Sequence, residues 1–397
     1  MQTLPLEGVR VVDISNFLAG PGATMFLADF GAEVIKCERG PEGDEFRRWG
    51  YDKNGVGLYF KMVNRNKKSV TADLRTPLGV EIVKRLVKNA DVIVENYRPG
   101  TIEKWGLGYD VLSAINPRIV LLRISGYGQN GPNSKKPGYG TSLEAYSGLV
   151  YVNGHPDRAP LLTAFATGDV TTAMMGAFLT LVALRERERS GQGQVIDLAL
   201  YEPLLTLLGP IMLDYDQLGI VQQRDGSHLP WVAPRNVFTA RDGKYVVVSA
   251  GSQDVFTRLC SALEIPEIAE DPRFLTNRDR MQHREELDEI MQRAIERFDL
   301  DDLVSRIESA HAVVAPVRSI AEIIEDPHIL ARDGVITAQD ADLGPLRMQN
   351  VVGTLSRTPG KVRWTAPRCG EHDKEILQDE LGFTEAELQQ SSALVRQ

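Results

Sequence analysis

The stretch VRVVDISNFLAGPGATMFLADFGAEVIKCE, residues 9–38, contains the pattern that decides the fold. Residues 9–15 and 32–38 are apolar and rich in β-branched side chains, which is typical of strands buried on both faces. A glycine-rich turn and the helical spacing of residues 23–31 lie between them. Two buried strands joined by a helix predict a parallel βαβ unit.

The same alternation continues beyond this unit. Further apolar, strand-like runs lie at residues 68–74, 90–97, 118–128 and 194–200, and residues 76–89 have helical spacing. Strands separated by helices indicate an α/β protein with a doubly wound parallel sheet. We therefore expect a large Rossmann-like domain over residues 1–220.

The pattern changes after Gln217. Residues 231–251 carry two strands around an Arg-Asp-Gly turn, as in a hairpin, and charged helical segments follow. These features predict a smaller α+β domain over residues 225–325. A short β-like stretch and a helical tail make up residues 330–397, which we expect to return to the large domain.

Composition narrows the class of protein. A chain of 397 residues is too long for one ordinary core. It has no run of about 18 apolar residues and no signal pattern, which favours a soluble, cytoplasmic protein without a membrane partner. The three cysteines, Cys37, Cys260 and Cys369, lie far apart, which argues against a metal site, and a net charge of −9 argues against nucleic acid.

The turn after the first strand partly matches a dinucleotide fingerprint. Gly20 and Gly22 are present, but Met25 stands at the third glycine position and Pro21 removes a backbone donor. The match therefore disfavours NAD or FAD.

Basic residues follow several predicted strands. Arg39, Arg75, Arg98 and Lys104 lie at strand ends or in loops, where open parallel sheets bind ligands. Because arginine and helix N-termini suit phosphate, we expect a phosphate-bearing ligand.

The stretch TAFATGDVTTAMMGAF, residues 163–178, contains a single carboxylate, Asp169. One interpretation is an N-cap, since Asp169 follows Gly168 just before a buried helical run. The other is a nucleophile or base that the helix dipole and backbone amides keep ionised. These residues alone favour capping but leave both interpretations open.

Five segments together resemble the class III CoA-transferases, and the similarity runs from LPLEGVRVVDIS to GEHDKEILQDELGF. The segments are LAGPGATMFLADFGAEVIKCER, NRNKKSVTADLRTPLG, ADVIVENYRPGTIEKWGLGYD, RISGYGQNGP and GQGQVIDLALYE. The resemblance implies transfer of CoA between an acyl-CoA and a small carboxylic acid, with no permanently bound cofactor. It assigns the nucleophile to Asp169, working through aspartyl anhydride and aspartyl-CoA thioester intermediates, and implies an interlocked homodimer.

The resemblance also implies roles for other residues. Tyr139 would position the substrate, Leu18 would lie beside the thioester, and Gly251 would belong to a loop over the site. Arg235 would face a second carboxylate of the acceptor, as expected for a succinyl-CoA-like donor. CoA would be contacted by Phe17, Ala19, Arg39, Arg75, Asn96, Tyr97, Arg98 and Lys104.

Two alternatives remain open at this stage. Racemases related to this family use a histidine where this chain has Tyr139, and a phenol with a pKa near 10 is a poor base for an α-proton. A catalytically silent CoA-binding subunit is the other alternative, and the presence of Asp169 argues against it.

Overall fold

The computed structural model describes residues 3–388 and divides into two compact units. Unit 1 comprises Met1–Leu149, Leu162–Leu213 and His328–Gln397, and unit 2 comprises Val150–Leu161 and Asp214–Pro327.

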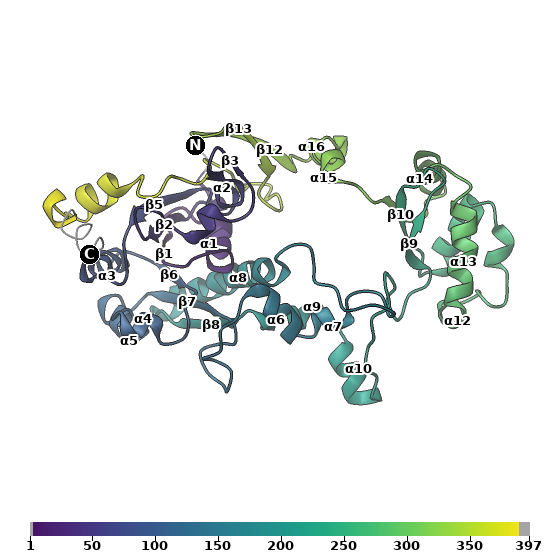
Figure 1. Ribbon diagram of the computed structural model, residues 1–397, viewed down its shortest axis with the longest axis horizontal. Helices are drawn as coiled ribbons and strands as arrows, with labels where there is room; N and C mark the ends of the chain where they lie inside the picture. Colours follow the sequence, from purple (N-terminus) through teal and green to yellow (C-terminus); the bar gives the residue numbers. More distant parts are fainter. Residues whose placement is uncertain (1–2, 389–397) are drawn as a thin grey trace. The chain divides into compact units, whose positions relative to one another are not determined.

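A six-stranded parallel sheet forms the centre of unit 1. Its order is β5-β2-β1-β6-β7-β8, which Figure 1 shows. The strands are β1 (Arg10–Asp13), β2 (Glu33–Glu38), β5 (Lys67–Thr71), β6 (Val92–Glu95), β7 (Val120–Ser125) and β8 (Val195–Ala199). Every neighbouring pair is parallel, so the prediction of an α/β fold with a parallel sheet is confirmed.

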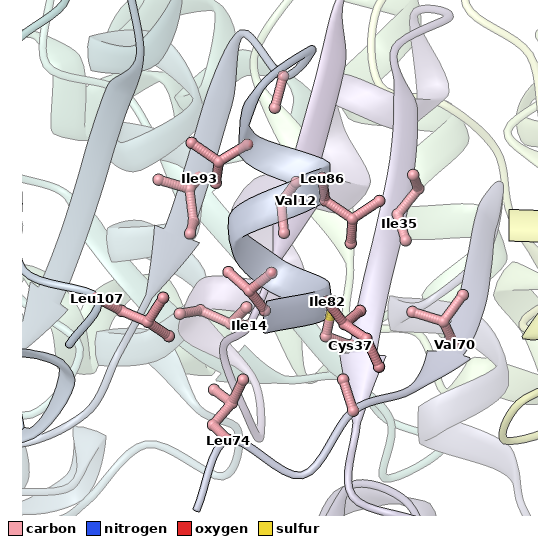
Figure 2. Close-up of a cluster of buried hydrophobic side chains, with 14 of the residues drawn as sticks. Val12, Ile14, Ile35, Cys37, Val70, Leu74, Ile82, Leu86, Ile93 and Leu107 are labelled. Carbon is pink, nitrogen blue, oxygen red and sulfur yellow. The ribbon is translucent and has the colours of Figure 1, made fainter. Parts of the chain in front are cut away.

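Helices cover one face of the sheet at α3 (Pro77–Val87), α4 (Thr101–Lys104) and α5 (Tyr109–Ile115). Ile82 and Leu86 of α3 pack across the strands onto side chains such as Val12 and Ile35, as Figure 2 shows. The buried core on this face forms because alternate strand residues point to the same side.

The opposite face is covered by α1 (Ala19–Asp29) and α8 (Thr167–Ser190). Small residues bring these helices close together, since a Cβ atom on Gly22 would lie 2.9 Å from the Cβ of Ala173. By length and composition alone α8 could cross a membrane, a test that core helices of soluble proteins also pass. One side of α8 packs against α1, and its first turn carries Asp169.

Further elements of unit 1 surround the sheet. They are η1 (Glu45–Arg48), β3 (Asp52–Lys53), β4 (Val56–Gly57), α2 (Leu58–Val63), α6 (Gly140–Tyr146), α9 (Tyr201–Leu207), α16 (Pro327–Ala331), β12 (Val335–Asp340), β13 (Gly344–Gln349) and η3 (Asp373–Glu380). Ile376 and Leu377 of η3 are buried in the same core as α3. The last residues of the predicted C-terminal segment, 389–397, lie outside the described residues.

Unit 2 contains a three-stranded antiparallel sheet in the order β11-β10-β9. The hairpin predicted around Arg-Asp-Gly is confirmed, because β9 (Arg235–Thr239) and β10 (Tyr245–Ser249) pair antiparallel. The other elements are β11 (Val314–Pro316), α11 (Gln253–Ala262), η2 (Pro266–Ala269), α12 (Asn277–Gln282), α13 (Arg284–Ile295), α14 (Leu300–Ser309) and α15 (Ile320–Ile323). The helices α7 (Leu149–Val152) and α10 (Ile211–Leu218) lie where the chain passes between the units.

Candidate active site

A cavity of about 490 Å³ in unit 1 lies beyond the carboxyl ends of the strands. It receives residues that end or follow all six of them: Asn16 and Phe17 after β1, Cys37 and Arg39 from β2, Ala72 and Arg75 after β5, Asn96 to Arg98 after β6, Ser125 and Gly126 from β7, and Leu200 after β8. The strand order reverses direction between β1 and β6, which is where open α/β sheets bind their ligands.

Four basic side chains line this cavity: Arg39, Arg75, Arg98 and Lys136. Arg75 already bonds to Asp73, with 2.9 Å between Nε and Oδ1. Arg98 and Lys136 make no side-chain hydrogen bond or ion pair with any residue between 3 and 388. These two cations are therefore available to an anionic ligand such as phosphate.

Asp169 lines the same cavity as the third residue of α8. The N-cap of α8 is Ala166, and Asp169 does not cap the helix, so the capping interpretation is wrong. Within the described chain, no donor is hydrogen-bonded to the Asp169 carboxylate. Burial, and then the charge of Glu144, raise the pKa of Asp169 to about 6. The expected hydrogen bonds from helix amides to this carboxylate are not formed, and burial and a like charge raise its pKa rather than lower it.

Two glycines make room for this carboxylate. A Cβ atom on Gly140, the first residue of α6, would lie 2.1 Å from Oδ2 of Asp169. A Cβ atom on Gly168 would lie 3.1 Å from the carbonyl oxygen of Gly140. The first turns of α6 and α8 thus meet through glycine, and the Asp169 carboxylate lies against the α6 backbone.

Aromatic rings surround the carboxylate side of the cavity. Phe17 makes edge-to-face contacts with Trp49 and with Tyr139, at centroid distances of 5.7 and 6.3 Å. Tyr59 lies close enough to be affected by Asp169, since burial and then the Asp169 charge raise the pKa of Tyr59. Phe17 and Tyr139 therefore place aromatic rings on the cavity lining, with Trp49 packed behind Phe17.

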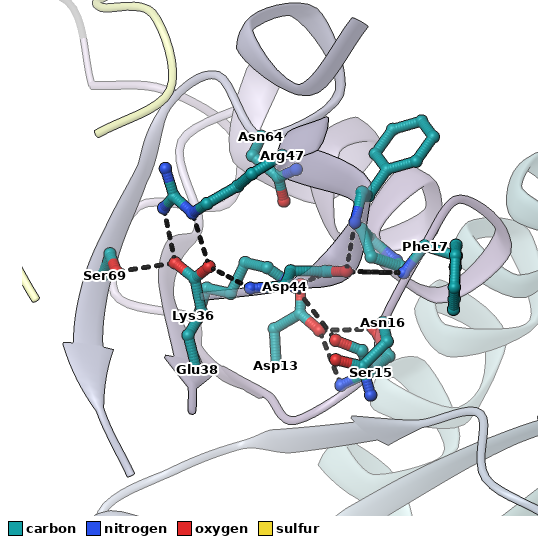
Figure 3. A network of polar contacts seen from close by, with 12 residues as sticks. Asp13, Ser15, Asn16, Phe17, Lys36, Glu38, Asp44, Arg47, Asn64 and Ser69 are labelled. Atoms are coloured by element: carbon teal, nitrogen blue, oxygen red, sulfur yellow. Dashed lines mark hydrogen bonds and ion pairs between the residues drawn. The ribbon is translucent and has the colours of Figure 1, made fainter. Parts of the chain in front are cut away.

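A buried polar network holds the Phe17 turn in place (Figure 3). Phe17 has a left-handed φ of 61°, and its N–H lies 3.2 Å from each carboxylate oxygen of Asp44. Asp44 is paired with Lys36 at 2.9 Å, and the ammonium of Lys36 also donates to the carbonyl of Ser15 at 2.9 Å. Because non-glycine residues rarely adopt this backbone conformation, the network offsets local strain at the cavity wall.

Removing the ammonium of this network should destabilise the fold. Lys36→Met leaves Asp44 buried without its cation, so the free energy of unfolding should fall by about 3–5 kcal/mol. Urea unfolding followed by fluorescence measures the change. Lys68→Met, at a partly exposed pair on the adjacent strand, is the matched control and should cost less than about 1 kcal/mol. Equal losses in the two variants would contradict a stabilising role for the buried pair.

Comparison with known proteins agrees with this geometry. Residues 6–373 match the CoA-transferase family III. The chain belongs to this family. It is 44% identical to the succinyl-CoA–D-citramalate CoA-transferase of Chloroflexus aurantiacus, over 97% of this chain and 96% of that one.

This CoA-transferase is also similar to a second curated enzyme and to a solved structure. The succinyl-CoA–L-malate CoA-transferase beta subunit of Chloroflexus aurantiacus is 38% identical over 97% of this chain and 96% of its own. The crystal structure of a CAIB/BAIF family protein from Brucella suis superimposes with a TM-score of 0.85 at 34% identity, covering 95% of this chain and 99% of that chain. The chain is thus a class III CoA-transferase by sequence and by fold.

The cavity of this CoA-transferase brings together most of the residues expected to bind substrate. They are Asp169, Tyr139, Phe17, Ala19, Arg39, Arg75, Asn96, Tyr97 and Arg98. Leu18 does not line the cavity, because its side chain is buried against Phe46 and Phe60. Lys104 is exposed at the end of α4, also away from the lining.

Two expected site residues belong to unit 2 of the CoA-transferase. Gly251 lies between β10 and α11, and its carbonyl accepts a hydrogen bond from Arg280. Arg235 begins β9, and one of its guanidinium nitrogens donates to the carbonyl of Ser227. Sequence reasoning missed Gly140 and Glu144, whose spacing of four residues was the available signal for a shared helix face.

Proposed function

We propose that this enzyme transfers CoA from a succinyl-CoA-like donor to a small dicarboxylic acid, through covalent intermediates on Asp169. The observation that carries this proposal is the cavity itself: Asp169, Arg98 and Lys136 line it, and none of the three side chains has a hydrogen-bond or ion-pair partner among residues 3–388. The family membership supports the reaction class.

CoA transfer would proceed in four steps, each involving the carboxylate of Asp169. Asp169 attacks the acyl carbonyl, which forms an aspartyl anhydride and releases CoA thiolate. The thiolate attacks the aspartyl carbonyl, which forms an aspartyl-CoA thioester and releases the donor acid. The acceptor carboxylate displaces the thiolate to form a second anhydride, and the thiolate then attacks the acceptor carbonyl, releasing the new acyl-CoA and free Asp169. Each intermediate stays activated, so no energy of the thioester is lost to water.

The environment of Asp169 suits a nucleophile. A carboxylate that receives no hydrogen bonds and is desolvated is less stabilised as the anion than one in water. Its lone pairs are therefore free to attack, and a raised pKa goes with greater intrinsic nucleophilicity. Gly140 leaves room for Oδ2 of Asp169, and Asp169 lines the cavity.

The raised pKa predicts an acid limit to catalysis. Asp169 reacts as the anion, so kcat/KM for acyl-CoA should reach a plateau well above pH 6 and fall about tenfold per pH unit below it. Because phosphomonoesters titrate in the same range, the profile is measured again with a 3′-dephospho-CoA thioester. The same midpoint with both substrates supports Asp169, whereas a midpoint near pH 4 contradicts it.

Arg98 provides the test for where the phosphates of CoA bind. Arg98→Ala should raise the KM for acyl-CoA about 10- to 100-fold with little change in kcat, since a charge-assisted hydrogen bond is worth about 1.5–3 kcal/mol. Lys104→Ala is the control, because Lys104 lies off the cavity lining, and its KM should stay at the wild-type value. An unchanged KM in Arg98→Ala together with a raised KM in Lys104→Ala would place the phosphates near α4 instead.

The choice of acceptor rests on the relatives and on charge. The relatives named above act on D-citramalate and L-malate, so we propose a C4–C6 dicarboxylic acid. Its second carboxylate needs a cation when buried, and Arg235 in unit 2 is the candidate. Mass spectrometry of CoA products, from a screen of acyl-CoA donors against carboxylic acids, measures the preference. Succinyl-CoA should exceed formyl- and acetyl-CoA by about tenfold or more, and absence of transfer to every acid would overturn the proposed function.

We also propose that the enzyme works as a homodimer, as the resemblance implies. Met174, Phe178 and Val182 form an apolar stripe along α8, and they are 49%, 58% and 50% exposed in the single chain. A stripe of this kind is typical of a surface that another chain covers. Light scattering on the purified, active protein should give twice the chain mass. Activity that appears only with a second, related chain would contradict the homodimer.

A further inference from the structure

A second carboxylate lies at the start of α8, and the proposed chemistry does not use it. Glu144 of α6 is only 2% exposed. Its Oε1 accepts a hydrogen bond from the backbone N–H of Gly168 at 3.0 Å, and its Oε2 lies 3.3 Å from the hydroxyl oxygen of Thr163, which lies 2.8 Å from the carbonyl oxygen of Phe165 as well. Gly168 is the second residue of α8, where backbone N–H groups have no partner within the helix. Glu144 therefore caps α8 from a neighbouring helix.

The position of Glu144 on α6 connects this cap to the nucleophile. Gly140 and Glu144 are four residues apart, so they lie on one face of α6. Gly140 contacts the Asp169 carboxylate, and Glu144 binds the amide of the residue just before Asp169. One helix face therefore determines both where α8 begins and where the Asp169 carboxylate lies.

The loop before α8 is tied to the same carboxylate. The Thr167 hydroxyl donates to the hydroxyl oxygen of Thr163 at 2.7 Å, and Thr163 lies within reach of Glu144. These bonds fix the backbone over residues 163–168, which would otherwise lack a side-chain cap because Ala166 is the N-cap.

We propose that Glu144 is the positioning residue of the active site: it holds the first turn of α8 against α6 and so fixes the Asp169 carboxylate over Gly140. This inference rests on the proposed role of Asp169 in transfer.

The negative charge of Glu144 also affects the pKa of Asp169. The ionisable groups that affect or adjoin Asp169 in unit 1 are Glu144 from α6, Tyr59 from α2 and Tyr139 at the N-cap of α6. Among them, the carboxylate of Glu144 raises the pKa of Asp169, after burial. Removing that charge without removing the acceptor oxygen should make Asp169 easier to ionise.

Two substitutions separate geometry from charge. Glu144→Gln keeps an oxygen that can accept from Gly168 and a side chain that reaches Thr163, so kcat at pH 8 should stay within about threefold of wild type. The acid limb of its pH profile, meaning the range below the plateau where kcat/KM falls, should move to lower pH because the like charge is gone. Glu144→Ala removes the cap, so kcat should fall about tenfold or more at every pH, with KM for acyl-CoA nearly unchanged.

Hydrogen exchange at the Gly168 amide gives a readout that does not depend on activity. Exchange should be about tenfold faster or more in Glu144→Ala and close to wild type in Glu144→Gln. Glu202→Gln is the matched control, because this carboxylate of α9 also accepts a backbone N–H, that of Ala199 at 2.9 Å, but does not line the cavity, so it should change neither the acid limb nor the exchange rate at Gly168. An unmoved acid limb in Glu144→Gln, or wild-type kcat and exchange in Glu144→Ala, would overturn the inference. A wild-type enzyme without transfer activity would instead overturn the proposed function.

Discussion

Asp169→Asn should lower kcat for CoA transfer by about 10⁴-fold or more, because the amide cannot form the anhydride. The fold and the affinity for CoA should stay close to wild type, since the cations of the cavity are untouched. Steady-state kinetics and calorimetric titration with CoA measure the two quantities. Glu202→Gln, at a carboxylate that does not line the cavity, is the matched control, and it should keep kcat within about threefold. A variant at Asp169 with a tenth of wild-type turnover would contradict the covalent assignment.

The same substitution should also stabilise the protein. An Asp whose pKa is raised on folding reduces stability when it is ionised, so the penalty is present at high pH and shrinks as the pH falls below 6. Asp169→Asn removes it, which predicts a gain of about 1–3 kcal/mol at pH 8. The difference in Tm between variant and wild type should therefore be largest at pH 8 and smaller at pH 5. A loss of stability at pH 8 would contradict the buried, unpaired state of Asp169.

Gly140→Ala is expected to have the second-largest effect on activity. The new Cβ atom would lie 2.1 Å from Oδ2 of Asp169, so the carboxylate has to move by more than an ångström. A displacement of that size in a reacting group lowers the rate by about 10²-fold. Steady-state kinetics should show this loss in kcat, with KM for acyl-CoA little changed because the phosphate-binding side is not disturbed.

Gly108→Ala is the control for the glycine substitution itself. Gly108 is the N-cap of α5 with an ordinary φ of −62°, and its new Cβ would lie 3.2 Å from the Cγ of Glu103 and at ordinary contact distance, 3.7 and 3.8 Å, from its Cα and Cβ. The Glu103 side chain needs to shift by only a few tenths of an ångström, which its ion pair with Arg123 at 2.7 Å can follow, so activity should stay near wild type. Full activity in Gly140→Ala would mean that Asp169 tolerates a different position from the one in the structure.

The fold was largely predictable because its signals are local. Most strands of the six-stranded sheet are short runs dominated by apolar, β-branched residues, which a sheet covered on both faces requires. The exception is β5, which reads KKSVT and is held by its place at the edge of the sheet. The position of the cavity also follows from local signals, since parallel strands bring their carboxyl ends to one edge. This is why Arg39, Arg75 and Arg98, which are far apart in the chain, line one cavity.

The electrostatics of the site could not be predicted in this way. The segment around Asp169 has the composition of a helix start, and a local pattern favoured a capping carboxylate. The cap is Glu144 instead, which arrives from a helix 25 residues earlier in the chain. Only the contact between α6 and α8 shows that two carboxylates share one small volume, and that contact raises rather than lowers the pKa of Asp169.

Transfer of oxygen to Asp169 tests the covalent account most directly. The acceptor acid is labelled with ¹⁸O in both carboxylate oxygens, and a single turnover is followed by digestion and mass spectrometry. The tryptic peptide of residues 159–185 contains one carboxylate side chain, Asp169. The anhydride route predicts that this side chain gains one ¹⁸O atom, because the acceptor leaves an oxygen behind when CoA thiolate takes its carbonyl. An unlabelled peptide after turnover, with both labelled oxygens accounted for in other products, would contradict it.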